Sequence, residues 1–177
     1  EVFDRLTRLA SHLLHTPVAV VSLVDADREF IKSSVGLPSE WKERRETPRG
    51  HSLADIAIAA KAAIAIEDAR EHPLVKDNPI LPAWGAVSYA AVPLLSQEGH
   101  ALGSVYVLDK EPRAWTTADI AALTAVAAAA ETEIALRVAL RETDRARAAM
   151  KTMLERVPYA LFTVDGDWRF TFVNDKD

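Results

Sequence analysis

The chain has 177 residues, 49% hydrophobic and 27% charged, which is typical of one folded domain of average size with an appended segment. Its formal net charge of −5 argues against a nucleic-acid-binding surface, which usually concentrates Lys and Arg on one face. Because no apolar run approaches the roughly 18 residues of a spanning helix and no signal peptide is present, we expect a cytoplasmic fragment without a membrane partner. The absence of cysteine excludes thiol nucleophiles, disulfides and thiolate zinc sites.

The first third of the chain alternates between helix and strand patterns. Apolar residues recur every three or four positions over 2–14, which predicts an amphipathic helix ending before Pro17. The β-branched run 18–24 predicts a buried strand, and the mixed run 28–35 predicts a second strand. Residues 39–50 are expected to form a charged loop, with Trp41 folded back onto the body of the domain.

The middle of the chain predicts one short helix and three strands. Ser52 is expected to cap a helix over 53–60, with Asp55 completing an arrangement like a capping box. A short strand over 63–66 is followed by a proline-punctuated loop. Residues 86–94 and 101–108 flank a short loop containing Gly99, which is typical of an antiparallel hairpin.

The last helix is expected to start after a cap at Thr116 or Thr117 and to run without Gly or Pro over about 118–156. At 1.5 Å per residue it is about 60 Å long, so part of it must extend beyond one domain. A seam with alternating spacings of four and three residues predicts a coiled coil, and hence a homodimer. The seam positions are Leu136, Leu140, Thr143, Arg147, Met150, Leu154 and Val157.

After Pro158, the runs 161–164 and 168–173 predict two strands joined by a turn at 165–167. An isolated two-stranded hairpin is marginally stable in water. The tail is therefore expected to begin another domain or to use a partner surface.

Three segments together resemble bacterial GAF domains of signalling proteins: VAVVSLVDADREFIKSSVGLP, IEDAREHPLVKDNP and YAAVPLLSQEGHALGSVYVLDKEPRAWTTADIAAL. The resemblance covers residues 1 to about 135. It implies an α+β fold with an antiparallel sheet of about six strands, the terminal helices on one face and a loop-covered pocket on the other. The tail LERVPYALFTVDGDWRFTFVND resembles the opening strands of a PAS domain. The expected division is a GAF domain at 1–135, a linker helix at 136–157 and a truncated PAS start at 158–177.

The chain departs from many GAF relatives after the loop Arg49-Gly50-His51-Ser52. Those relatives have Phe-Cys there, whereas this chain has Leu53-Ala54 and no cysteine anywhere. Methionine sulfoxide reduction and covalent bilin attachment, which use cysteine in the family, are therefore excluded. A cyclic-nucleotide signature of the phosphodiesterase type is not recognisable either.

The candidate ligand-binding residues each have a structural alternative. His51 precedes the pocket-forming helix of the resembled fold and could donate to an anion or carbonyl, or could bond only to backbone. Trp84, Tyr89 and Tyr106 could line a pocket for a planar ligand or could pack in the core. Asp55 completes the set. Haem ligation by His51 or His72 is a further alternative. The cluster Asp68, Arg70, Asp77 and Asn78 could contact a ligand, but its residue types favour helix capping and turn formation.

These patterns favour a non-catalytic sensory domain that binds a small ligand or relays a signal through a dimeric helix. The alternative is a ligand-free dimerisation spacer, and no constellation of residues supports an enzyme. The sequence names neither a cofactor nor a ligand. The output domain could be a histidine kinase, a phosphatase or a cyclic-dinucleotide enzyme.

Overall fold

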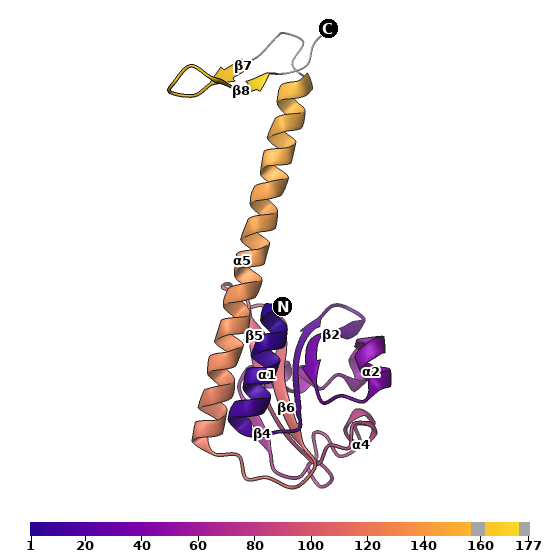
Figure 1. Ribbon diagram of the computed structural model, residues 1–177. Helices are drawn as coiled ribbons and strands as arrows, with labels where there is room; N and C mark the ends of the chain where they lie inside the picture. The colour runs from indigo at the N-terminus through magenta and orange to yellow at the C-terminus, as the bar shows by residue number, and fades with distance from the viewer. Residues whose placement is uncertain (157–161, 174–177) are drawn as a thin grey trace. The chain divides into compact units, whose positions relative to one another are not determined.

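The computed structural model describes residues 1–156 and 162–173. Its centre is a six-stranded antiparallel sheet in the order β3-β2-β1-β6-β5-β4 (Figure 1). The strands are β1 (Val18–Val24), β2 (Arg28–Val35), β3 (Glu46–Pro48), β4 (Ile64–Ile66), β5 (Ser88–Leu95) and β6 (Ala101–Asp109). The predicted α+β fold with about six strands is confirmed. The chain divides into two compact units, residues 1–135 and 136–177.

One face of the sheet is covered by the terminal helices α1 (Val2–Leu14) and α5 (Thr117–Arg156) (Figure 1). Their apolar faces pack on small and β-branched strand residues such as Ala19, Val21 and Ala90. The helix residues buried there are Phe3, Leu6, Ala10 and Leu14 of α1 and Leu123, Val126, Ala127 and Ala130 of α5. The alanines let α5 approach the sheet closely, so the first part of this helix belongs to the domain.

The opposite face is covered by short elements: α2 (Ser39–Arg44), the 3-10 turn η1 (Arg49–His51), α3 (Ala54–Ala60) and α4 (Ile80–Ala83). A second core lies beneath them, and it includes Val20, Ile31, Leu53, Ile66 and Leu81. Trp41 is half-buried and packs against this core, as predicted.

The prediction of a plain loop over 39–50 was wrong. The segment contains α2, β3 and η1, because its backbone groups pair with β2: the Ile31 amide donates to the Arg45 carbonyl at 2.8 Å, and β3 pairs antiparallel with β2. Strand β2 supplies hydrogen-bond partners that the local sequence does not reveal. A run of charged side chains can therefore form ordered structure at the edge of a sheet.

The expected capping box at Ser52 is only half formed. The Ser52 hydroxyl accepts from the Asp55 amide at 3.3 Å, but the Ser52 amide donates to the Arg49 carbonyl at 3.1 Å. The Asp55 carboxylate pairs instead with the Arg49 guanidinium. The helix begins at Ala54, so Ser52 is not its N-cap residue, and the short Asp side chain does not reach back as Glu would.

The β5–β6 hairpin is confirmed, with Gly99 at φ 80° in its loop. The start of α5 has a reciprocal cap in which the Asp119 amide donates to the Thr116 hydroxyl at 3.1 Å, and the Thr116 amide donates to the Asp119 carboxylate at 2.9 Å. The hydrogen bond from the Thr116 amide lowers the pKa of Asp119. Burial opposes this effect, but the pKa stays below its usual value. The expected cap at Thr116 is therefore present.

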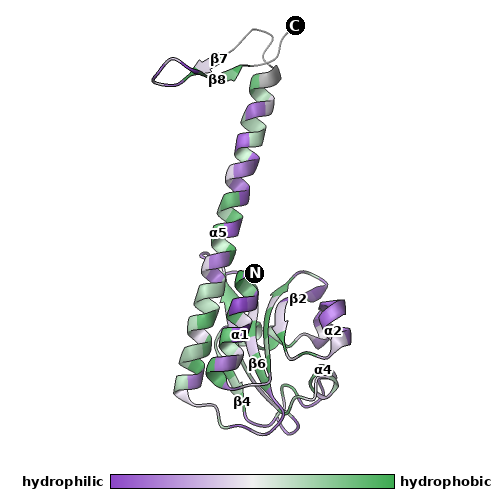
Figure 2. Cartoon of the chain, in the orientation of Figure 1, coloured by the Kyte–Doolittle hydropathy of each residue, from purple (hydrophilic) through white to green (hydrophobic). Residues whose placement is uncertain are grey.

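The second unit contains the rest of α5 and a hairpin of β7 (Phe162–Val164) and β8 (Phe170–Val173). Its turn is fixed by Asp165, whose carboxylate accepts from the Asp167 and Arg169 amides. The predicted hairpin is present, although its expected first residue Leu161 lies outside the described residues. Hydrophobic and hydrophilic residues alternate along this part of α5 (Figure 2). None of the helices in the described ranges could cross a membrane, by length and apolarity together.

Candidate functional site

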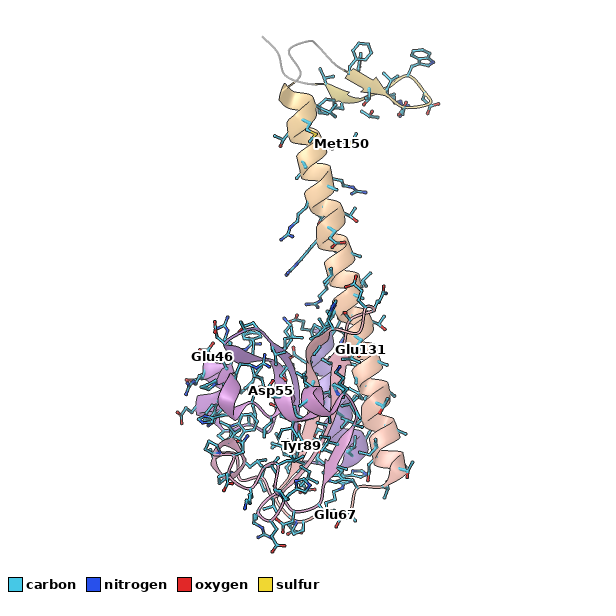
Figure 3. The ribbon with its side chains drawn as sticks, turned by 180° about the vertical axis from the view of Figure 1, so that it is seen from behind. Glu46, Asp55, Glu67, Tyr89, Glu131 and Met150 are labelled. Atoms are coloured by element: carbon cyan, nitrogen blue, oxygen red, sulfur yellow. The ribbon has the colours of Figure 1, made fainter. Side chains whose placement is uncertain are left out.

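Three aromatic side chains meet in the core beneath the short elements. Trp84 follows α4, Tyr89 lies on β5 and Tyr106 on β6, and they are 4%, 0% and 0% exposed. The Trp84 and Tyr106 rings are stacked with centroids 6.5 Å apart, and Tyr89 is tilted against Tyr106 at 6.0 Å. Tyr89 lies inside the folded body (Figure 3). The structure therefore brings together three of the five candidate residues, here called the aromatic cluster.

A buried carboxylate lies beside the aromatic cluster. Glu29 of β2 is 1% exposed and accepts three hydrogen bonds. The Tyr106 hydroxyl donates to Oε1 at 2.9 Å, while the Thr47 hydroxyl and the Leu53 amide donate to Oε2 at 3.2 and 3.1 Å. Glu29 thus links β2 to β6, to β3 and to the start of α3.

Tyr89 extends the same network. Its hydroxyl donates to the Leu53 carbonyl at 2.6 Å, so both backbone groups of Leu53 are used. Burial raises the pKa of both Tyr89 and Tyr106 well above the usual value, and the nearby Glu29 charge adds to the rise. Both phenols therefore stay neutral donors and are unsuited to act as general bases near neutral pH.

Sequence reasoning missed Glu29. A signal was available, because Glu29 lies two positions before the buried Ile31 and therefore on the same face of β2. A glutamate at the start of a strand, next to Arg28, is more often solvated, so the pattern alone did not single it out.

One polar atom of the aromatic cluster lacks a hydrogen-bond partner within the described ranges. It is the Trp84 indole Nε1, which is buried. Leaving a buried N–H group unsatisfied costs about 1–3 kcal/mol. An acceptor atom on a bound molecule would remove that cost.

The other two candidates lie outside the aromatic cluster. His51 is exposed in η1, and its carbonyl accepts from the Asn78 side chain at 3.2 Å. Asp55 is half-buried and pairs with Arg49, whose guanidinium also donates to the Asp25 carbonyl at 2.6 Å. These contacts hold the segment that covers Glu29, and neither side chain hydrogen-bonds to the aromatic cluster.

A cavity of about 350 Å³ lies in the loop region between β4 and β5, and its lining residues do not include the three rings of the aromatic cluster. Its apolar wall includes Val75, Leu81 and Ala86, which belong to the same core as the cluster. Arg70 also lines it and pairs with Asp68, while the Asn78 side chain accepts from the Ile80 amide at 2.9 Å. Asp68 and Asn78 thus have the turn-forming contacts that the sequence favoured. Within the described ranges, no group of three His, Asp or Glu side chains could hold a metal ion.

The two phenols should differ in their contribution to stability. Tyr106→Phe removes a hydrogen bond to a buried carboxylate, and we expect it to lower the free energy of unfolding by about 2–3 kcal/mol. Tyr89→Phe removes a bond to a neutral carbonyl and should cost about 1 kcal/mol. Urea unfolding of both variants measures the difference. Equal losses, or a larger loss in Tyr89→Phe, would contradict the network described here.

The GAF domain family model matches residues 1–134, so the chain belongs to the GAF domain family. This is the class of domain that the sequence resemblance implied.

A curated relative comes from Pseudomonas aeruginosa and is named cyclic di-GMP phosphodiesterase PA2567. The chain is 36% identical to it over 114 residues, which is 64% of this chain and 19% of the relative. The chain therefore spans about a fifth of that protein's length.

Two solved structures show the same fold. The GAF domain of a phosphoenolpyruvate-protein phosphotransferase from Coxiella burnetii matches with a TM-score of 0.68 at 19% identity, covering 79% of this chain and 84% of that one. A domain of a putative two-component sensor histidine kinase from Sinorhizobium meliloti matches with a TM-score of 0.62 at 15% identity, covering 81% and 95%. At these identities the likeness concerns the fold alone.

Proposed function

We propose that the chain is a non-catalytic regulatory segment of a bacterial signalling protein. It takes a small ligand at the aromatic cluster and passes the resulting change to an output domain through a homodimeric α5. The observation that carries this proposal is the continuity of α5: residues such as Leu123 and Val126 are buried in the domain, and the same helix runs on to Arg156.

Contacts at the start of α5 support a relay from the ligand-facing core. The Trp115 indole N–H donates to the Ile66 carbonyl at 3.1 Å, and Ile66 belongs to the core that contains the aromatic cluster. Arg113 donates to the Leu14 carbonyl at 2.6 Å and to Asp119 in the first turn of α5 at 3.2 Å. A rearrangement around Ile66 would therefore act directly on the first turn of α5.

The second part of α5 supports a paired helix. Leu136, Leu140 and Met150 are 64%, 61% and 64% exposed, and Thr143 and Arg147 are exposed too. Leu154 is half-buried, and Val157 lies outside the described residues. Leucines and methionine at alternating spacings of four and three gain by burial against a second copy, whereas Thr143 and Arg147 weaken the seam. A weak seam has alternative registers of similar energy, which a bound ligand can repopulate.

Single cysteines test the pairing, because the chain has none of its own. Arg147→Cys places a thiol on the proposed seam, and Arg145→Cys places a matched thiol two residues away on the outer face. Under mild oxidation we expect Arg147→Cys to form a disulfide-linked dimer and Arg145→Cys to stay largely monomeric on a non-reducing gel. Equal cross-linking of the two variants, or none in either, would contradict a parallel pair in this register.

The remainder of the parent protein also belongs to this proposal. Of the three outputs expected from the sequence, the name of the Pseudomonas relative favours a cyclic-dinucleotide enzyme. The hairpin β7–β8 would be the first part of a PAS domain. Its exposed apolar side chains Phe162, Phe170 and Val173 then pack against the rest of that domain.

A ligand-free dimerisation spacer remains the second candidate. The observation that favours it is the complete burial of Tyr89 and Tyr106, whose rings and hydroxyls are already in contact with protein. A spacer predicts the same cross-linking as a sensor. It differs in predicting that no small molecule stabilises the domain.

A further inference from the structure

We infer that the ligand of the aromatic cluster is a small organic ammonium ion whose positive charge is balanced by Glu29. The inference rests on the proposed function, because it names the chemical class that the proposed site accepts. It follows from three features of the site: a buried carboxylate without a basic partner among the described residues, aromatic rings that no protein cation contacts there, and an unsatisfied indole N–H.

Among the described residues, the Glu29 carboxyl group has no basic side chain as a partner. Its three hydrogen-bond donors, from Tyr106, Thr47 and Leu53, are all neutral. Among the described residues, the ion pairs within 4.0 Å include none with the Glu29 carboxylate, whereas Glu46 and Asp55 each have an arginine. A buried carboxylate is strongly destabilised unless an opposite charge compensates it. A ligand with a positive charge supplies that compensation.

The rings beside Glu29 suit a cation. Trp84 and Tyr106 are stacked, and aromatic faces attract ammonium groups, most strongly in a desolvated site. Trp41, which packs edge-on against Trp84, already makes such a contact. The Arg44 guanidinium lies 5.3 Å from its ring. The cation–ring contacts of the described residues do not include Trp84, Tyr89 or Tyr106. No cation of the described residues therefore contacts these rings, and a ligand cation reaches them only by displacing part of the packing that Trp84, Tyr89 and Tyr106 make with one another.

The Trp84 indole N–H narrows the chemical class of the ligand further. It is buried without an acceptor, so a ligand that carries an oxygen atom near its ammonium group would satisfy it. The best fit is an ammonium ion with a hydroxyl or carbonyl oxygen a few bonds away.

The access route lies at the edge of the sheet. Two of the donors to Glu29 come from residues 47 and 53, in the segment that contains the short edge strand β3 and η1. Arg49 ties this segment to the end of β1 by donating to the Asp25 carbonyl at 2.6 Å, and its guanidinium also pairs with Asp55. When the segment moves aside, Glu29 loses two neutral donors, and an arriving ammonium group takes their place.

Thermal unfolding with two matched probe pairs tests the inference. Choline and its uncharged isostere 3,3-dimethyl-1-butanol have nearly the same shape, and n-butylammonium is compared with 1-butanol. We expect a concentration-dependent rise in Tm with choline or n-butylammonium at millimolar concentrations and no rise with either alcohol. Proton–nitrogen NMR should show a shift of an indole N–H signal that disappears in Trp84→Phe.

Glu29→Gln tests the counter-ion role, with Glu98→Gln in the exposed β5–β6 loop as the control. We expect Glu29→Gln to weaken ammonium binding at least tenfold and Glu98→Gln to leave it unchanged. If Glu29→Gln does not fold, the comparison of each ammonium ion with its alcohol in the unaltered chain still tests whether binding requires a positive charge. No response to either ion, an equal response to the alcohols, or unchanged binding in folded Glu29→Gln would overturn the inference.

The outcomes separate this inference from the proposed function. Binding of a neutral or anionic molecule at the aromatic cluster, with no response to ammonium ions, refutes the ammonium class and leaves the sensor role standing. Failure of Arg147→Cys to cross-link refutes the relay through α5 whatever the ligand is.

Discussion

Gly36→Ala is expected to lower the free energy of unfolding by about 3 kcal/mol. Gly36 ends β2 at φ +75°, a left-handed conformation that costs an alanine roughly 1–2 kcal/mol. An added Cβ would also lie 1.9 Å from the Pro17 carbonyl oxygen, which is backbone and cannot rotate away. Relief of that overlap requires the entry to β1 to move, at a further cost of about 1–3 kcal/mol.

Gly50→Ala is the matched control for this prediction. A Cβ built at Gly50 meets no atom within 4 Å, so we expect a change within about 0.5 kcal/mol. Urea unfolding followed by circular dichroism measures both variants. A Gly36→Ala protein as stable as Gly50→Ala would show that the close approach of Pro17 to Gly36 is absent in solution.

Replacing both polar seam residues, Thr143→Leu with Arg147→Leu, is expected to tighten the dimer by about 700-fold or more. The change buries four additional leucines per dimer, and even about 1 kcal/mol from each amounts to about 4 kcal/mol. Sedimentation equilibrium measures the dissociation constant. In the full-length signalling protein we expect the same change to abolish the response to input, because the alternative registers are no longer populated.

The matched control places the same substitutions on the outer face of the helix. Thr152→Leu with Arg145→Leu changes one threonine and one arginine at exposed positions away from the seam. We expect the dissociation constant to stay within a few fold and the response to persist. A normal response in the Thr143→Leu, Arg147→Leu protein would refute the idea that the seam changes register.

Much of the fold could be predicted because local periodicity reports burial directly. The apolar spacing over 2–14 predicted α1, and its members Phe3, Leu6 and Leu14 are buried, whereas Val2, Leu9 and Leu13 are exposed. The β-branched run of β1 predicted its position inside the sheet. The aromatic cluster could be named for the same reason. Large rings on predicted strands must lie on one face or the other, and Tyr89 and Tyr106 share the face away from α1 and α5.

The rest depended on partners distant in sequence. Glu29 is exceptional because of Tyr106, 77 positions later, and no local pattern around Glu29 announces that hydrogen bond. The segment 39–50 is ordered by pairing with β2, although its own residues are typical of a loop. The place of His51 before α3 favoured a ligand-binding role. Its exposure depends on how η1 packs, which the sequence around it does not determine.

Native mass spectrometry of the purified chain tests the central claim, that a ligand-binding domain is coupled to a paired helix, because it reports subunit number and retained mass together. We expect a dimer that carries a small cationic molecule in the unaltered chain and loses it in Glu29→Gln while remaining dimeric. A monomer would contradict the paired helix. A dimer that neither retains nor binds a small molecule would contradict the sensor and favour the spacer.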